Sequence, residues 1–340
     1  MKIIECVPNF SEGNNNDLFD AIKEELKKIE NVKLLSLEPD ADYNRVVVTF
    51  AGDENGILNG ALASCRTAAD FIDMRRHKGE HPRLGAIDVV PFVPVANATT
   101  EECVKISEEF GRKISSELNV PVYLYESASR KPDRKSLSSI RQGEYEGLNE
   151  KLLDPNWLPD FGAPVFNPKL GALVTGSRFF LIAYNVNIKS TDVKFAKEIG
   201  EILRESGFSK RDENGNIIKV DGKAVKVPGR LKEVKGMGVA LEKYKITQVS
   251  MNLTNYNVTP MHVAFEETKK EAARLGVDVN GSEIVGLVPL ESMLQAGRFY
   301  TQGKIKDEKG LVDAAVDNLG LSALHNFDPQ EKIIEYKMRQ

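Results

Sequence analysis

Apolar and polar residues alternate along the chain in two rhythms, one typical of strands and one typical of helices. Strand-length apolar runs occupy residues 3–7, 32–37 and 46–50. Apolar residues at helical spacing occupy residues 18–29, 57–72 and 103–118. A further strand over residues 179–188 begins a second, similar set of elements. The pattern predicts an α+β protein of two subdomains, each an open sheet with helices on one face.

The length of the chain also indicates more than one core. Its 340 residues exceed what a single small core usually holds. We expect an N-terminal subdomain at residues 1–177, a C-terminal subdomain at residues 178–302 and a helical tail at residues 303–340. Residues 208–232 are polar and carry Asn-Gly and Asp-Gly sequences, which predict a protruding hairpin. We assign no chemistry to this hairpin.

Ionisable residues are most crowded in the stretch between residues 74 and 95. Three arginines, a lysine, a glutamate and two of the four histidines fall within residues 75–83, directly before the largely apolar residues 86–95. A polar loop at the mouth of a buried strand is a common place for a site. Charged neighbours tune the pKa of an imidazole for proton transfer near neutral pH, so the two histidines are candidates for acid–base catalysis.

A second interpretation of the same loop is a zinc site. His77, Glu80 and His81 match the pattern H-x-x-E-H, which binds zinc when a helix places both imidazoles on one face. Gly79 weakens a helix interior, and Pro82 disfavours the helical conformation for His81. A zinc hydrolase is therefore a weaker interpretation of this loop than acid–base catalysis. A third interpretation is a solvated loop without a role.

Two further polar segments are candidates for ligand contact. Residues 38–45 place three carboxylates before Arg45, so that Asp40 or Asp42 can orient an imidazole and Arg45 can bind a carboxylate. Residues 157–178 set glycines among prolines, which exposes backbone amides beside aromatic rings. This segment contains neither a G-x-G-x-x-G nor a Walker pattern, so we expect no nucleotide phosphate loop. A solvated turn and an inter-domain linker are the respective alternatives.

Charge and cysteine content narrow the class of protein. The net charge is -4 and the isoelectric point is near 5.8, which argues against a general nucleic-acid binder. No apolar run approaches the roughly 20 residues that span a bilayer, and residues 2–7 are too short and too acidic for a secretory signal. Three widely spaced cysteines fit reduced, buried thiols. We therefore expect a cytoplasmic protein without a nucleic-acid or membrane partner.

Four long motifs, in the same order along the chain, resemble the glutamate formimidoyltransferase family. They are ECVPNFSEGNN at 5–15, RRHKGEHPRLGAIDVVPFVPV at 75–95, VPVYLYE at 120–126 and PDFGAPVFNPKLGALVTGSR at 159–178. The family transfers the formimino group of N-formimino-L-glutamate to N5 of tetrahydrofolate in histidine degradation. It also forms the N-terminal half of formimidoyltransferase-cyclodeaminase, and the short tail after residue 302 leads us to expect no cyclodeaminase domain here.

The resemblance carries expectations for the site. It implies ferredoxin-like subdomains that flank a ligand groove, a homodimer, tetrahydrofolate as co-substrate and His81 as general acid and base. We expect the substrate to contact Asp40, Arg45, Lys78 and Arg83. By resemblance, folate lies against Gly162, Ala163, Pro164, Val165, Phe166, Asn167, Pro168, Lys169, Leu170 and Gly171.

Two related activities stay open at this point. A folate-binding protein without catalysis would bind tetrahydrofolate and release no glutamate. Transfer of a formyl group between 5-formyltetrahydrofolate and glutamate cannot be separated from formimino transfer by these motifs. The sequence also leaves open which of Glu38, Asp40 and Asp42 orients the histidine.

Overall fold

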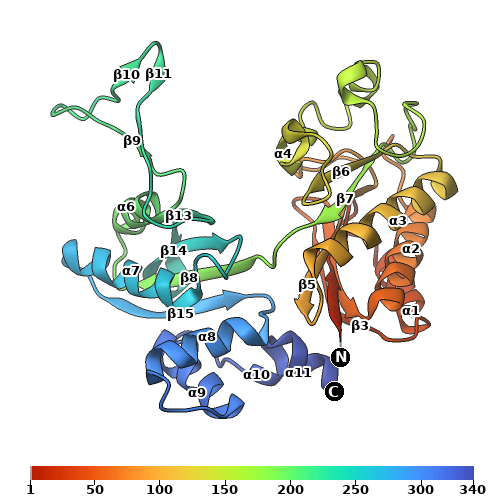
Figure 1. The fold of residues 1–340 in the computed structure, drawn as a ribbon. Coiled ribbons are helices and arrows are strands. Elements are labelled where there is room, and N and C mark those ends of the chain that lie inside the picture. The colour runs from red at the N-terminus through yellow and green to blue at the C-terminus, as the bar shows by residue number, and fades with distance from the viewer. Residues whose placement is uncertain (1) are drawn as a thin grey trace. The chain divides into compact units, whose positions relative to one another are not determined.

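Two sets of alternating strands and helices build the protein (Figure 1). The computed structural model describes residues 2–340. The chain divides into two compact units, Met1–Phe179 and Phe180–Gln340.

The first unit begins with a βαββαβ arrangement. Its elements are β1 (Ile3–Cys6), β2 (Asn9–Phe10), α1 (Asn16–Lys27), β3 (Val32–Asp40), β4 (Arg45–Gly52), α2 (Glu54–Phe71) and β5 (Ile87–Ala96). The strands β1 and β2 lie in succession between β4 and β5, and β3 pairs with the other edge of β4. All these pairs are antiparallel, which gives the strand order of a ferredoxin-like fold.

A parallel extension widens this sheet. Helix α3 (Thr100–Leu118) leads to β6 (Val122–Glu126), and β7 (Leu173–Ser177) inserts between β5 and β6. Successive residues of a strand point to opposite faces, and here Val122 packs in the main core whereas Tyr123 packs in a second cluster. The main core buries α1, α2 and α3 against one face of the sheet. The second cluster covers part of the other face.

Residues 127–160 form that cover over β6 and β7. They contain α4 (Leu137–Ile140), α5 (Leu148–Lys151) and the short 3-10 helices η1 (Pro132–Arg134) and η2 (Pro155–Trp157). Three cations bind backbone carbonyls inside the cover. Arg134, only 1% exposed, donates to the oxygens of Asn156 and Leu158. Lys131 donates to the same Asn156 oxygen, and Lys151 donates to the oxygens of Ile140 and Gln142.

The second unit repeats the βαββαβ arrangement without the extension. Its elements are β8 (Ile182–Ile188), α6 (Val193–Leu203), β13 (Val234–Leu241), β14 (Ile246–Leu253), α7 (Met261–Arg274) and β15 (Val279–Val285). The antiparallel strand order β13-β14-β8-β15 is again that of a ferredoxin-like fold. Both units therefore confirm the α+β prediction, whereas the ligand groove stays a prediction.

The expected tail is part of the second unit. It continues from α8 (Leu290–Thr301) through α9 (Glu308–Leu319), α10 (Pro329–Lys332) and α11 (Ile334–Arg339). Helix α9 packs against α8 and β15. No helix within residues 2–340 is both long enough and apolar enough to cross a membrane.

The predicted hairpin also forms, as an arm that projects from the second unit (Figure 1). It contains β9 (Phe208–Ser209), β10 (Lys219–Val220), β11 (Lys223–Ala224) and β12 (Lys226–Val227). Asp221 and Gly222 connect β10 to β11 with φ values of 50° and 78°. Left-handed φ at both central residues is typical of the type I′ turn that an Asp-Gly sequence favours.

Candidate active site

The loop that carries the predicted catalytic histidine runs between α2 and β5. Residues 77–84 contain no helix, so His77 and His81 do not share a helical face. The geometric requirement of the zinc interpretation is not met, as Gly79 and Pro82 led us to expect. Within residues 2–340, no three His, Cys, Asp or Glu side chains are arranged to hold a metal ion.

Asn44 fixes one side of this loop. Its side chain donates to the Lys78 carbonyl at 2.7 Å and accepts from the Gly13 backbone N–H at 2.8 Å. The Nε2 atom of His77 lies 3.2 Å from the Asn44 carbonyl. Asn44 has a left-handed φ of 49°, which asparagine tolerates better than most residues. One residue thus joins the β2–α1 loop, the β3–β4 turn and the histidine loop.

The predicted folate segment fixes the other side. The Met74 N–H donates to the Lys169 carbonyl, and the Ala86 N–H donates to the Leu170 carbonyl, both at 2.9 Å. Gly85 forms a β-bridge with Gly171. Both ends of the histidine loop are therefore bonded to residues 169–171. Gly162, Ala163 and Val165 of the same segment line a pocket of about 490 Å³ with the end of α3, and His81 is not among the residues of this pocket.

His81 itself is buried, with 7% of its surface exposed. Burial, the largest cause, acts together with the positive charges of Arg141, Arg45, Arg83 and His77, in that order, to lower its pKa to about 4. The imidazole is therefore neutral at pH 7. No hydrogen bond to this ring is found within the described part of the chain. The catalytic role expected of His81 stays a prediction.

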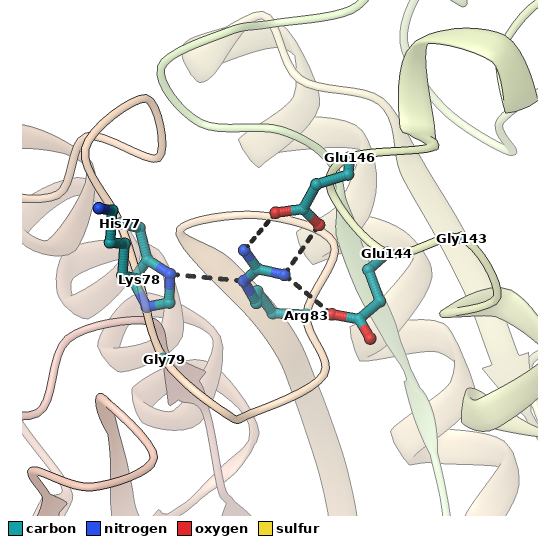
Figure 2. A pocket seen from close by; sticks show the side chains of 7 residues that line it. All are labelled: His77, Lys78, Gly79, Arg83, Gly143, Glu144 and Glu146. Atoms are coloured by element: carbon teal, nitrogen blue, oxygen red, sulfur yellow. Dashed lines mark hydrogen bonds and ion pairs between the residues drawn. The ribbon is translucent and has the colours of Figure 1, made fainter.

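Arg83 lies beside His77 and is engaged by two carboxylates (Figure 2). Its Nη1 donates to Glu144 at 2.8 Å and to Glu146 at 2.9 Å, and its Nη2 donates to Glu146 at 2.6 Å. Its Nε lies 3.4 Å from Nδ1 of His77. These residues, with the exposed Lys78, line a pocket of about 550 Å³. The substrate contacts expected of Arg83 and Lys78 stay predictions, and Arg83 also ties this loop to residues 144–146.

Arg45 differs from the other arginines near His81. The Arg83 charge is balanced by Glu144 and Glu146, and Arg141 pairs with Asp88. The Nε atom of Arg45 is buried and has no hydrogen-bond partner among residues 2–340, and its guanidinium lies 6.0 Å from the Tyr43 ring centroid. A buried donor without an acceptor is costly, so this atom is the candidate among these arginines for contact with a ligand oxygen. The substrate contact expected of Arg45 stays a prediction.

Asp40 ends β3 directly opposite Arg45 in the strand register. Its carboxylate accepts a hydrogen bond from the Tyr43 N–H at 3.1 Å and so closes the β3–β4 turn. The principal charges acting on His81 come from cations rather than from this acidic turn. The role of Asp40 in substrate contact stays a prediction.

The structure adds Asp88 and Arg141 to the residues predicted around His81. Asp88 is 1% exposed, accepts from the Leu84 N–H at 3.0 Å and forms an ion pair with Arg141. A signal for Asp88 was present, because it is the only charged residue in the apolar run 86–95 and a buried carboxylate needs a partner. Nothing in the sequence distinguishes Arg141 from its many cationic neighbours.

Comparison with known proteins identifies the family of the chain. Residues 3–178 match the N-terminal subdomain of the formiminotransferase domain, and residues 183–339 match the formiminotransferase domain. The whole chain is 48% identical to a formimidoyltransferase-cyclodeaminase of Dictyostelium discoideum and spans 61% of that protein's length. It is 40% identical to a glutamate formimidoyltransferase of Streptococcus pyogenes serotype M1, with 88% of this chain and 94% of that protein covered.

A glutamate formimidoyltransferase of Thermoplasma acidophilum is 39% identical, with 93% of this chain and 98% of that protein covered. The two domain matches together extend over both units of the fold. The chain therefore belongs to the formiminotransferase domain family.

Proposed function

We propose that the protein transfers the formimino group of N-formimino-L-glutamate to N5 of tetrahydrofolate, giving 5-formiminotetrahydrofolate and L-glutamate in histidine degradation. One observation carries the proposal. A buried, neutral His81 lies near an Arg45 guanidinium with an unpaired donor, in a loop bonded to residues 169–171. The names of the relatives that this chain covers over 94–98% of their length support the same reaction.

The reaction needs one proton to move between two nitrogen atoms. N5 attacks the formimino carbon, and the C=N electron pair moves onto the imino nitrogen. A tetrahedral intermediate results, and its collapse breaks the bond to the glutamate nitrogen. The neutral His81 accepts the N5 proton and returns it to the departing nitrogen, a role that contributes about 10²- to 10⁴-fold to the rate.

The cations around His81 suit a dicarboxylate substrate. Arg45 binds one carboxylate of the glutamate moiety. The exposed Lys78, which lines the pocket beside His77 and Arg83, contacts the other. A bound carboxylate offsets the Arg45 charge, so the pKa of His81 rises when substrate is present. The imidazole then holds the proton more readily between the two transfers.

The co-substrate tetrahydrofolate lies along residues 162–171 in this proposal. Phe166 and Tyr145 form an aromatic pair with ring centroids 5.4 Å apart, and the Tyr145 hydroxyl donates to the Pro168 carbonyl at 2.7 Å. Apolar ring faces beside exposed backbone suit a flat pterin. Because residues 169–171 bond to the histidine loop, a pterin held there lies close to His81.

The proposal is tested by mixing protein, tetrahydrofolate and N-formimino-L-glutamate and following 5-formiminotetrahydrofolate. We expect His81→Gln to lower kcat by about 10²-fold or more while tetrahydrofolate binding persists. His325→Gln is the matched control, because His325 lies in the second unit and bonds to Tyr244. Near wild-type turnover of a folded His81→Gln protein would refute the assignment.

A parallel reaction with 5-formyltetrahydrofolate and glutamate separates formimino from formyl transfer. Tetrahydrofolate binding without any glutamate release would favour a folate-binding protein instead.

We also propose a cytoplasmic homodimer. The three cysteines Cys6, Cys65 and Cys103 are free and buried, which suits a reducing compartment. The dimer rests on family resemblance and is tested by light scattering of the purified chain. A mass near the 37.7 kDa of one chain would contradict it.

A further inference from the structure

The sheet of the second unit carries polar side chains on the face opposite its core. Every second residue of β8, beginning with Tyr184, is fully buried in the core. Successive residues of a strand point to opposite faces, so Asn185 and Asn187 lie on the other face. In the strand register, Asn187 pairs with Gln248 of β14, and Asn185 pairs with Glu283 of β15. Amide and carboxylate side chains of three neighbouring strands therefore meet on one surface.

Hydrogen bonds fix the orientation of two amide groups on this face. The Nε2 atom of Gln248 donates to Asn187 Oδ1 at 2.8 Å and to Glu283 Oε2 at 3.2 Å. The Nδ2 atom of Asn187 donates in turn to the Asn280 carbonyl at 3.2 Å. A peptide carbonyl and an ionised carboxylate can only accept, so neither amide can be turned around without losing its bonds.

This orientation leaves two acceptors side by side. Both hydrogen atoms of Gln248 Nε2 are used inside the face, and no hydrogen bond to its Oε1 is found among residues 2–340. Gln248 is only 3% exposed, so its side chain is held in place by its surroundings. Glu283 is half-buried and forms no ion pair within the described part of the chain. A fixed carbonyl oxygen beside an unbalanced carboxylate suits a cation that carries N–H groups.

We propose that Gln248 Oε1 and the Glu283 carboxylate bind the amidinium group of a formimino compound. An amidine is a strong base that carries a proton at pH 7, so it presents N–H donors together with a positive charge. A formyl group is similar in size but presents a carbonyl oxygen, which both acceptors repel. The pair therefore favours formimino over formyl compounds. The carboxylate also favours the protonated amidine, in which the carbon is more electrophilic.

This inference rests on the proposed function for the identity of the ligand, so binding and turnover are measured separately. Titration calorimetry of the full chain at pH 7 compares N-formimino-L-glutamate with N-formyl-L-glutamate. We expect the wild type to bind the formimino compound more tightly. Glu283→Gln should weaken that binding by about 10-fold or more, because a charge-assisted hydrogen bond is lost. Binding of the formyl compound should not weaken.

Two further variants support the comparison. Glu213→Gln is the matched control, because it removes one carboxylate from an exposed position of the arm in the same unit, and it should leave both affinities unchanged. Gln248→Met removes Oε1 and keeps the Glu283 carboxylate, so it should also weaken binding of the formimino compound. Glu283→Gln keeps an acceptor for Gln248, and circular dichroism checks that each variant folds.

An equal loss of formimino and formyl binding in folded Glu283→Gln, or no loss of either, would overturn the inference. Kinetics give the second readout, since the KM for N-formimino-L-glutamate should rise in Glu283→Gln by the same factor as the dissociation constant. A preference for the formimino compound that depends on Glu283, in a protein that transfers no formimino group, would refute the proposed function and leave this inference standing. Transfer with an unchanged KM in Glu283→Gln would do the reverse.

Discussion

The unpaired Nε of Arg45 is the most informative single atom near His81. A charge-assisted hydrogen bond to a substrate carboxylate contributes about 1.5–3 kcal/mol, equivalent to a 10- to 100-fold change in affinity. We expect Arg45→Met to raise the KM for N-formimino-L-glutamate by that factor with a smaller change in kcat. Arg66→Met serves as the control, because Arg66 pairs with Glu117 between α2 and α3. Steady-state kinetics measure both variants. An unchanged KM would remove Arg45 from the substrate site.

A buried carboxyl in β1 gives a prediction about stability. Glu5 is 4% exposed, and burial raises its pKa to about 7 from an ordinary value of 4.5, with Arg178 opposing the rise. The folded protein therefore holds a proton that the unfolded chain has lost between pH 4.5 and 7. The stability that this proton supplies is present below pH 4.5 and is lost as the pH rises through 7.

Glu5→Gln cannot lose that proton. We expect the free energy of unfolding of Glu5→Gln, relative to that of the wild type, to rise by on the order of 3 kcal/mol between pH 4.5 and pH 8. Urea unfolding at the two pH values measures the difference. A constant difference would show that the Glu5 carboxyl titrates normally. The neighbouring residue, Cys6, adds no such pH dependence of stability, since burial raises the pKa of its thiol far above this range.

At the scale of elements, the contact between Gly85 and Gly171 joins the histidine loop to the predicted folate segment. Gly171 has a φ of 69°, and a Cβ there would lie 2.2 Å from the Leu84 carbonyl oxygen. We expect Gly171→Ala to destabilise the protein by at least about 2 kcal/mol, through left-handed strain and a backbone clash. It should also weaken tetrahydrofolate binding, because residues 169–171 must move away from the loop.

Gly215→Ala provides the control for strain alone. Gly215 has a φ of 82° but nothing lies within 4 Å of a Cβ built there. We expect this variant to cost only about 1 kcal/mol and to leave folate binding intact. Thermal unfolding and a tetrahydrofolate titration compare the two proteins. Equal effects in both would show that the approach of Gly85 to Gly171 does not matter.

Local chemistry explains which elements were predictable. The pattern of Thr99 and Glu102 predicts a helix start, and the structure confirms a capping box with bonds of 3.2 and 2.8 Å. The sequence also predicts that Ser190 caps the helix after β8, and the structure contradicts this prediction. Asp192 caps α6 instead, accepting from Lys194 N–H at 2.9 Å, while Ser190 accepts from Asp192 N–H. Polar residues that are close in sequence compete for the cap position, so the sequence alone does not decide which of them caps the helix.

The candidate site was predictable only where its residues crowd together in sequence. The cluster around His81 and the acidic turn before Arg45 are local, and the structure brings Arg45 close enough to act on the His81 charge. Arg141 lies 60 residues after His81 in the sequence. Its pairing with Asp88 depends on how residues 127–160 fold over the sheet, and no local pattern encodes that path.

The whole molecule consists of two units with separate cores. Within the second unit, Tyr184, Val186 and Ile188 of β8 are fully buried, as are Ile199 and Leu203 of α6. The Tyr184 hydroxyl donates to Ser282 Oγ at 2.8 Å and so joins β8 to β15. We expect residues 180–340 to fold alone, because these contacts are internal to the unit.

Circular dichroism of the isolated residues 180–340 tests this, with residues 1–179 as the companion fragment. A cooperative thermal transition is the expected result. A chain that melts gradually would show that the second core depends on the first. Since His81 and residues 162–171 all belong to residues 1–179, we expect this fragment to retain measurable tetrahydrofolate binding.

The cover over β6 and β7 is held together by cations that bind neutral carbonyl oxygens within it, and this has a consequence for its behaviour at high salt concentration. Dissolved ions screen the attraction between two full surface charges, but they act weakly on a buried guanidinium that donates to peptide oxygens. Arg134 is such a group, being almost wholly enclosed. Molar sodium chloride should therefore loosen the exposed Lys27–Glu24 and Lys28–Glu25 pairs of α1 before it opens the cover.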